Sequence, residues 1–340
     1  MRGRAALEDK VVVVTGASAG VGRASARAFA RAGAHVGLIA RDPGRLEAAS
    51  AEIAALGRRA CAVPADVADA DAVERAADRI EQELGAIDVW VNSAMATVLA
   101  PFIETDPDDY RRVTEVTYLG SVNGTRAALT RMLRRDQGTI VQVGSALAYR
   151  GIPLQSAYCG AKHAIKGYTE SVCSELIARR SRIHIAMVEL PAVNTPQFDW
   201  ARNRLPRRPR RLAPVFQPEV AADAIVFAAT ARRREVMLGA STVLTVWGNR
   251  VAPGLMSRIL ARIATSGQQD TELDDPARPD NLWQTVPGNQ GAHGRFDDEA
   301  HDRSLQLWAN RHRAWLAAVG VGMLTAALVR RRGAGRFGGT

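Results

Sequence analysis

The stretch VVVVTGASAGVGRASARAFA, residues 11–30, joins a run of four valines to a glycine-rich turn and then to a helical pattern. A β-branched run followed directly by glycines and a helix is typical of a unit whose turn faces a phosphate. Glycine lets the backbone approach a pyrophosphate closely, and the N–H groups at the helix N-terminus point toward it. The motif predicts a dinucleotide site that uses these residues of the turn: Gly16, Ser18, Ala19, Gly20, Val21 and Gly22.

Short apolar runs alternate with alanine- and arginine-rich helical stretches along the first 190 residues. Apolar strands separated by helices predict a parallel sheet that is buried on both faces. Right-handed crossovers then give an α/β fold, a doubly wound Rossmann-type sheet with its ligand site at the carboxyl ends of the strands. The expected strands are 11–14, 35–40, 60–63, 87–91, 139–143 and 183–189, with helices such as 22–32, 43–56 and 70–84 between them.

The net charge of +10 is carried by the last third of the 340-residue chain. Up to residue 200 there are 24 basic and 23 acidic residues, so the excess of arginine lies beyond that point. A nucleic-acid-binding protein needs a basic face with aromatic side chains that stack on bases. The near-neutral first part and the 5% aromatic content argue against nucleic acid as a partner. Three cysteines without a C-x-x-C pair argue against a disulfide framework and against a zinc site.

The residue after the second predicted strand bears on the choice of cofactor. That strand ends at Ala40, and Arg41 follows it. An NAD site usually offers a carboxylate here for the ribose 2′-hydroxyl, whereas a guanidinium suits the 2′-phosphate of NADP. The neighbouring Asp42 points away if Arg41 points into the site. The sequence therefore favours NADP(H), with NAD(H) as the alternative; Arg23 is either a second phosphate ligand or a solvated residue of the first helix.

Tyr158 and Lys162 stand four residues apart in the segment YCGAK. At this spacing they share one face of a helix, where an ammonium lowers the pKa of a phenol. Tyr158 can then exchange a proton with a carbonyl or alcohol oxygen that Ser145 holds. Such pairs also occur on ordinary helix surfaces. The chain has only three lysines beside 42 arginines, which favours a specific need for a compact ammonium at this position.

Taken together, these motifs resemble the short-chain dehydrogenase/reductase family, with agreement in order and spacing over about residues 8–240. The resemblance implies an NAD(P)-dependent oxidoreductase acting on CH–OH groups, in which Tyr158 is the general acid/base. It implies that Lys162 is the pKa-lowering partner and binds the ribose, and that Ser145 holds the substrate oxygen. The matching segments are TGASAGVG at 15–22, Asp66-Val67, IDVWVNSA at 87–94, Ser145, YCGAK at 158–162 and LPAVNTP at 190–196.

The same resemblance implies further cofactor contacts at the ends of the later strands. Asp66 is expected to contact the adenine, with Val67 beside it. Asn92 is expected to support the cofactor-binding strand, with Ala94 just after it. Val193 and Thr195 are expected to hold the nicotinamide carboxamide.

The chain departs from the family pattern at three points. NSAM at 92–95 replaces the usual Asn-Asn-Ala-Gly, and Ala192 follows Pro191 where glycine is usual. Thr117 replaces an asparagine that usually takes part in a proton relay. Because a relay water can be held by a main-chain carbonyl, Thr117 is kept among the expected catalytic residues. We interpret the chain as a divergent active enzyme; the alternative is a catalytically weak NADP-binding regulatory or scaffold protein.

The sequence predicts a catalytic domain over 1–240, with a substrate loop at about 196–217, and a C-terminal extension. Six arginines and three prolines in 201–214 predict a mobile charged loop. The extension is expected to comprise an amphipathic apolar and basic segment at 241–266, a polar linker at 267–310, and a basic-flanked apolar helix and tail at 311–340.

Residues 314–329 carry no charge and are bracketed by arginines. A helix of this length spans ~24 Å, short of the ~30 Å hydrocarbon core of a bilayer, so a short anchor, an interfacial helix and a docking helix for a partner stay open. The arginines favour association with the cytoplasmic face of a membrane. From this segment we expect a lipophilic carbonyl or alcohol as the substrate. We also expect a homo-oligomer.

Overall fold

The computed structural model describes residues 7–313, 315, 316 and 318. The chain divides into two compact units, of which the first ends at Arg303. The described part of the second unit contains the short helix α12 (Leu305–Arg311), whose N-cap Ser304 accepts a hydrogen bond from the Leu307 N–H at 3.2 Å. The sheets and the site described below belong to the first unit.

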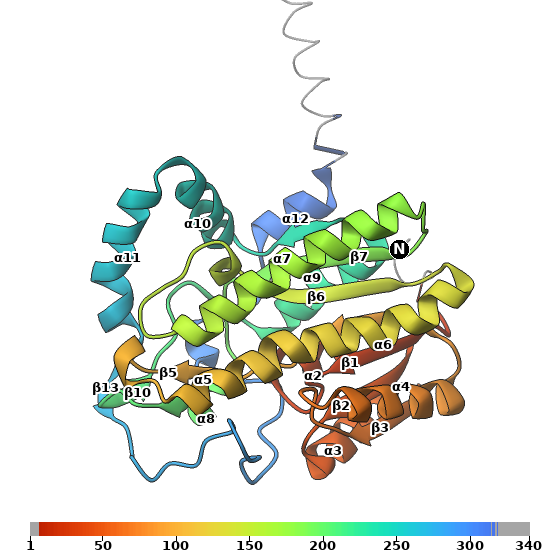
Figure 1. The fold of residues 1–340 in the computed structure, drawn as a ribbon, viewed down its shortest axis with the longest axis horizontal. Coiled ribbons are helices and arrows are strands. Elements are labelled where there is room, and N and C mark those ends of the chain that lie inside the picture. The colour runs from red at the N-terminus through yellow and green to blue at the C-terminus, as the bar shows by residue number, and fades with distance from the viewer. Residues whose placement is uncertain (1–6, 314, 317, 319–340) are drawn as a thin grey trace, which may run out of the picture. The chain divides into compact units, whose positions relative to one another are not determined.

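Seven parallel strands form the central sheet of the first unit, in the order β12-β7-β6-β4-β1-β2-β3 (Figure 1). Because β1 lies between β2 and β4, the chain progresses in opposite directions from it, and the switch point falls between β1 and β4. Open α/β sheets bind their ligands at such a point, outside the carboxyl ends of the strands. The strands are β1 (Val11–Thr15), β2 (His35–Ala40), β3 (Ala60–Pro64), β4 (Ile87–Asn92), β6 (Thr139–Ser145), β7 (His184–Leu190) and β12 (Glu235–Met237).

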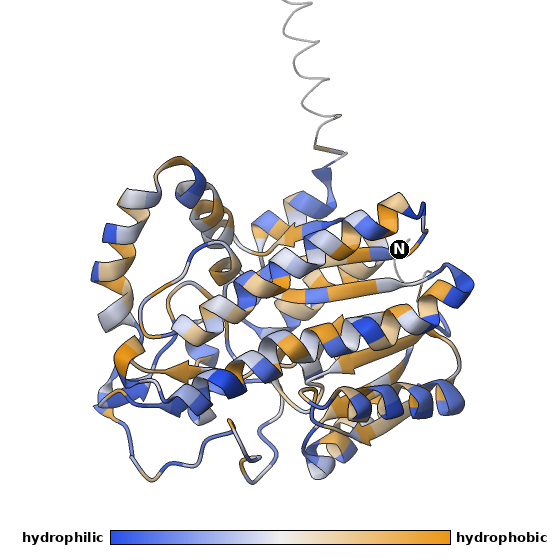
Figure 2. Ribbon diagram, viewed as in Figure 1, coloured by the Kyte–Doolittle hydropathy of each residue, from blue (hydrophilic) through white to orange (hydrophobic). Residues whose placement is uncertain are grey.

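Helices cover both faces of this sheet, which confirms the doubly wound α/β prediction. Figure 2 shows mostly apolar strands between helices whose outer faces are polar. One face carries α2 (Gly20–Arg31), α3 (Pro43–Ala55) and α9 (Pro218–Ala231), and the other carries α4 (Ala70–Leu84), α6 (Gly120–Arg135) and α7 (Ser156–Ala178). The valines of β1 lie in the core, and Val12, Val13 and Val14 are fully buried.

Shorter elements surround the carboxyl ends of the strands. A π-helical turn, η2 (Thr114–Leu119), connects α5 (Pro107–Val113) to α6. The amphipathic segment forms two helices, α10 (Ala240–Val251) and α11 (Pro253–Gly267), separated at Pro253 as expected from a residue without a backbone N–H. The remaining elements are β5 (Val98–Leu99), η1 (Phe102–Glu104), η3 (Ala146–Ala148), β8 (Ala192–Val193), α8 (Gln197–Trp200), β9 (Arg202–Asn203), β10 (Arg207–Pro209), β11 (Val215–Phe216), β13 (Gln269–Leu273), η4 (Asp297–Glu299) and β14 (Ala300–His301).

The segment 201–214 pairs with other elements of the fold, so the prediction of a mobile charged loop is wrong. Its strand β9 pairs with β5, and β10 pairs with β13. Arg202 pairs with Asp109 at 2.6 Å and with Asp280 at 2.9 Å, while Arg208 pairs with Glu272 at 2.8 Å. The sequence conceals these pairs because the carboxylates lie 64 to 93 residues away along the chain.

Most of the stretch expected to be a linker is a packed part of the first unit. We call residues 274–296, between β13 and η4, the strap. Leu282 in the strap is fully buried and belongs to the main hydrophobic core, and Ala292 and Phe296 are buried as well. These apolar residues are too widely spaced to give a helical or strand period, which is why the polar composition around them predicted a linker.

The apolar segment 314–329 lies almost entirely outside the described residues. Within the residues that the structure describes, no helix is both long and apolar enough to cross a membrane.

The burial of Leu282 provides a test of the strap. Leu282→Ala should lower the free energy of unfolding by about 2–5 kcal/mol, because it removes a fully buried side chain from a packed core. Leu273→Ala, at a neighbouring position that is 74% exposed, is the control and should change it by less than about 0.5 kcal/mol. Denaturant unfolding of both variants measures the difference, and equally small losses would contradict the packed arrangement.

Candidate functional site

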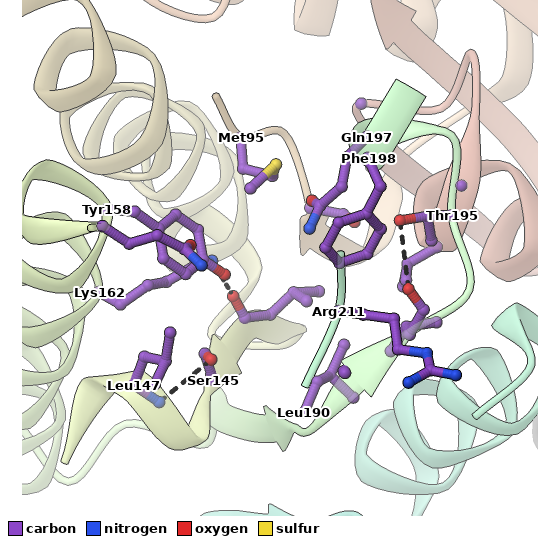
Figure 3. Close-up of a pocket in the computed structure, with 18 of the residues that line it drawn as sticks. Met95, Ser145, Leu147, Tyr158, Lys162, Leu190, Thr195, Gln197, Phe198 and Arg211 are labelled. Carbon is purple, nitrogen blue, oxygen red and sulfur yellow. Dashed lines mark hydrogen bonds between the residues drawn. The ribbon is translucent and has the colours of Figure 1, made fainter. Parts of the chain in front are cut away.

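A cavity of about 520 Å³ opens at the carboxyl ends of β1, β4 and β6. The glycine turn after β1 lines one part of it, and α7, α8 and α11 line the other. Figure 3 shows Tyr158, Lys162 and Ser145 on one side of this cavity and Thr195, Gln197 and Phe198 on the other. The cavity thus lies at the position where the sheet topology predicts a ligand.

The glycine turn fits a dinucleotide because side chains are excluded from it. Gly16 has a φ of +69°, and a Cβ there would lie 2.8 Å from the Ala94 Cα. A Cβ on Gly22 would lie 2.2 Å from the Gly16 carbonyl oxygen. Only glycine at both positions lets the N-terminus of α2 meet the end of β1, which leaves a cradle of the kind that binds pyrophosphate. Ser18, Ala19, Gly20 and Val21 also line the cavity.

Thr15 joins this turn to the loop after β4, and the sequence analysis did not single it out. Its hydroxyl oxygen accepts hydrogen bonds from the N–H groups of Ser93 at 3.1 Å and Ala94 at 3.2 Å. The two strand ends that flank the switch point are therefore held together by one side chain. Its place directly before the glycine turn is the signal that marks it in the sequence.

Asn92 lies in a buried network behind the cavity. Its Oδ1 accepts from the Trp90 indole at 2.8 Å, and its Nδ2 donates to Thr125 and Gln142, each at 3.0 Å. These bonds connect β4 to α6 and β6, which agrees with a supporting function. Contact between Asn92 and the cofactor stays a prediction.

Asp66 and Val67 both line the cavity, as does Ala94. Asp66 Oδ1 accepts from the Ala68 N–H at 3.0 Å, and its other oxygen pairs with Arg112. Arg112 also donates to the Leu282 carbonyl in the strap at 3.2 Å. The carboxylate expected to contact adenine is thus partnered by Arg112 in the protein itself.

Arg41 lines the cavity but donates to the strap. Its guanidinium bonds to the carbonyl oxygens of Leu282 at 3.2 Å and Trp283 at 3.1 Å, and also to that of Asn281. Asp42 also lines the cavity, so the expectation that it points away is not borne out, and its Oδ1 caps α3 by accepting from the Arg45 N–H at 2.9 Å. These acceptors are all main-chain carbonyl oxygens, which every residue has. The sequence pattern therefore could not predict that Arg41 binds the strap.

The strap contacts the glycine turn as well. The Gly20 N–H, at the start of α2, donates to the Gly291 carbonyl at 3.1 Å. Arg45 donates to the Gly288 carbonyl at 2.7 Å, and the buried Arg23 donates to a strap asparagine. The strap therefore lies along the cofactor side of the cavity, and its Asn281 and Thr285 are part of the lining.

Ser145, Tyr158 and Lys162 meet at the other end of the cavity. Ser145 ends β6 and accepts from the Leu147 N–H at 3.1 Å, which fixes its hydroxyl at the start of η3. Lys162 Nζ donates to the Val143 carbonyl at 2.7 Å and lies 5.5 Å from the centroid of the Tyr158 ring. The sequence predicted these three residues as a group, and the structure brings Ser145 of β6 together with Tyr158 and Lys162 of α7 in the cavity. Their catalytic functions stay a prediction.

Burial dominates the electrostatics of this group. It raises the pKa of the Tyr158 phenol, and a hydrogen bond with Ser145 opposes the rise. Burial also lowers the pKa of Lys162 to about 8, with Glu189 acting in the opposite direction. The expected fall in the Tyr158 pKa is therefore not found, because the burial of the phenol outweighs its hydrogen bond with Ser145.

Val193, the last residue of β8, and Thr195, two residues later, both line the cavity. Thr195 packs against the glycine turn, since a Cβ on Gly20 would lie 3.2 Å from its methyl carbon. Thr195 is thus beside the cradle. Their contact with a nicotinamide stays a prediction.

Comparison with known proteins agrees with this geometry. A family model described as short chain dehydrogenase matches residues 10–204. The chain is a member of the short-chain dehydrogenase family. It is an NAD(P)-dependent oxidoreductase, consistent with its relatives. The oxidoreductase YxnA of Bacillus subtilis is 30% identical over 329 residues, covering 96% of this chain and 92% of that protein.

Two further relatives cover less of the chain. Dehydrogenase/reductase SDR family member 7B of Bos taurus is 32% identical, covering 77% of this chain and 83% of that protein. A fatty acyl-CoA reductase of Acinetobacter baylyi is 29% identical, covering 68% of this chain and 76% of that protein.

In this short-chain dehydrogenase, Thr117 holds the backbone beside the cavity. It lies in the π-helical turn and is fully buried. Its hydroxyl accepts from the Ala96 N–H and donates to the Ala96 carbonyl, both at 3.0 Å. Thr117 does not line the cavity, so the structure favours a positioning function over the catalytic one expected from the sequence.

Thr117→Val should destabilise the protein by about 2–3 kcal/mol, because the Ala96 N–H and carbonyl both lose their buried partner. Thr117→Ser keeps the hydroxyl and should retain most of the stability. Thermal or denaturant unfolding measures the difference. Equal losses in the two variants would mean that the methyl group, and not the hydroxyl, matters.

Proposed function

We propose that this short-chain dehydrogenase interconverts a lipophilic carbonyl compound and its alcohol with NADP(H), using Tyr158 as the general acid/base. The observation that carries the proposal is the grouping of Tyr158, Ser145 and Lys162 in one cavity with a glycine cradle. The bound nicotinamide would supply or accept the hydride at the substrate carbon. No other group on the cavity wall combines a phenol, a hydroxyl and an ammonium in this way.

The chain's own residues position the substrate oxygen and move its proton. In the reducing direction the Tyr158 hydroxyl gives its proton to the oxygen as the carbon is reduced, while the Ser145 hydroxyl donates a hydrogen bond to the same oxygen. Lys162 stabilises the phenolate that remains. Phe198 and Met95 flank the cavity (Figure 3).

NADP(H) is preferred in this proposal because of the residues at the end of β2. Arg41 and Arg45 both line the cavity, and the nearby Asp42 is used as a helix cap. A 2′-phosphate there would replace neutral carbonyl acceptors on Arg41 with a charged one, which strengthens the hydrogen bonds. A ribose 2′-hydroxyl would have to share the carboxylate of Asp42 with the Arg45 N–H that it already accepts from.

A lipophilic substrate fits the wall opposite the glycine turn. Apolar side chains of α11, including Met256, Ile259 and Leu260, line the cavity together with Leu147 and Phe198. Pockets of this kind recognise apolar groups through burial and use a few polar groups to orient the ligand. The relative described as a fatty acyl-CoA reductase supports the same class of substrate. The homo-oligomer and the location at a membrane surface stay predictions.

Tyr158→Phe should reduce kcat by about 10²–10⁴-fold with hydrophobic ketones or aldehydes, because the proton donor is removed. NADPH binding should persist. Steady-state oxidation of NADPH and fluorescence titration measure the two quantities. Tyr118→Phe is the control, since it also removes a phenol hydroxyl but Tyr118 does not line the cavity. Turnover by Tyr158→Phe at the wild-type rate would overturn the proposed function.

Arg41→Ala should weaken NADPH binding by about 10–100-fold, equivalent to about 1.4–2.7 kcal/mol, because a charge-assisted contact is lost. NADH binding should change by less than about threefold. The matched control is Arg31→Ala, which removes an exposed arginine from the end of α2. Equal weakening of both nucleotides would assign Arg41 to strap packing alone and remove the support for NADP(H).

A further inference from the structure

The helices α10 and α11 expose apolar side chains that the mechanism above does not use. Residues three or four positions apart lie on one face of a helix, so each helix carries an exposed apolar row. An exposed apolar surface of this extent is typical of an interaction site. The apolar rows, all of whose residues are at least 40% exposed, are Leu244, Trp247 and Val251 on α10, and Leu255, Ile259 and Ile263 on α11.

The charge carried by these two helices is entirely positive. Residues 236–269 contain three arginines and no acidic residue. Arg250, Arg258 and Arg262 are exposed, and none of them forms an ion pair with a residue that the structure describes. Arg250 instead lies over the Trp247 ring, 5.2 Å from its centroid. The apolar rows are therefore accompanied by free positive charge, which complements an anionic partner.

The row on α11 is continuous with the cavity. Ile259 and Ile263 are both exposed and both line the cavity, so they lie at its rim. Met256 and Leu260 line the cavity from the same helix. Apolar side chains thus extend along α11 from the outer surface to the proposed substrate site.

Hydrogen bonds fix the two helices to the catalytic side of the cavity. Figure 1 shows α10 and α11 next to one another at an edge of the first unit. Arg150, just after η3, donates to Asn249 of α10 at 3.3 Å and to Ser257 of α11 at 2.5 Å. Asn249 donates to the Tyr149 carbonyl at 2.9 Å. Because η3 begins directly after Ser145, the helix pair is held in place relative to the proposed site of the substrate oxygen.

We propose that α10 and α11 dock on an anionic phospholipid bilayer and receive the lipophilic substrate from it. The proposal rests on the function proposed above and names the source of its substrate. Helices of this kind lie in the bilayer interface, with apolar residues among the acyl chains and basic residues near the phosphates. Trp247 suits the same position, because tryptophan is enriched where hydrocarbon meets headgroups. The surface belongs to the first unit and does not include residues 314–329.

The charge distinguishes a bilayer from a second copy of the chain. A symmetric contact between two copies would bring the same arginines of α10 and α11 together, and like charges at an interface oppose association. An anionic lipid surface attracts those arginines. The observations therefore favour lipid as the occupant of the apolar rows.

The first test measures binding to phosphatidylglycerol/phosphatidylcholine vesicles and needs no turnover. Trp247→Ser/Leu255→Ser in the full-length protein should weaken binding at least tenfold, because two apolar anchors are lost and neither lines the cavity. Leu133→Ser/Ile177→Ser, which removes two exposed apolar residues from α6 and α7, is the control and should bind like the wild type. Vesicle flotation measures the difference.

The same comparison is repeated with Leu324→Asp in every protein, so that the apolar segment 314–329 does not mask the effect. Undiminished binding of Trp247→Ser/Leu255→Ser in both backgrounds would overturn the proposal. Failure of the wild type to bind anionic vesicles would do so as well. Thermal unfolding of each variant verifies that the fold is retained.

The second test concerns the charge. Arg258→Gln/Arg262→Gln should weaken binding to the anionic vesicles at least fivefold and binding to pure phosphatidylcholine less than twofold, because only the former attracts the arginines. High salt should remove the difference. The control Arg134→Gln/Arg179→Gln removes the same charge from exposed positions of other elements. Equal losses in the two pairs would assign binding to net charge and refute a specific surface.

The third test connects docking to turnover. Trp247→Ser/Leu255→Ser should raise KM at least tenfold for a long-chain ketone dissolved in vesicles and change kcat/KM less than twofold for a short, water-soluble ketone. Equal effects on the two ketones would contradict delivery from lipid. Absence of turnover in the wild type refutes the proposed function, while vesicle binding still reports on docking. A fall in molecular mass without loss of vesicle binding, measured by analytical ultracentrifugation, would assign the rows to contacts between copies and overturn the proposal.

Discussion

The contact between the N-terminus of α2 and the end of β1 is the constraint on which the site depends. The Gly16 carbonyl lies where a Cβ on Gly22 would be, so the helix can approach the strand only without side chains. This approach places the first N–H groups of α2 at the switch point of the sheet. Thr15 then fixes the loop after β4 to the same point, and the rest of the cavity is assembled around the junction.

Much of the fold was predictable because its signals are local. The valine run, the glycine turn and the alternation of strands and helices depend on residues close in sequence, and the structure shifts their boundaries by only one or two residues. Tyr158 and Lys162 were found for the same reason, since helical spacing places them on one face. Their pKa values were not predictable, because burial depends on the whole surrounding fold.

The strap and the paired arginines were missed because they depend on contacts between distant segments. A run such as 201–214 has the composition of a solvated loop when read alone, and its carboxylate partners come from α5, β13 and the strap. The positive charge that distinguishes the last third of the sequence is thus partly neutralised inside the first unit. Charge counted along a sequence says little about charge presented at a surface.

Arg41, Arg45 and Arg112 bind the strap through its main-chain carbonyl oxygens. Every amino acid supplies such an oxygen, so most strap positions can change their side chain without losing these bonds. Substitution at Arg41 or Arg45 removes several of them at once. The strap can therefore change its side chains at positions that contribute only a carbonyl oxygen, whereas Leu282 and Asp280 hold it in place through side chains of a particular kind.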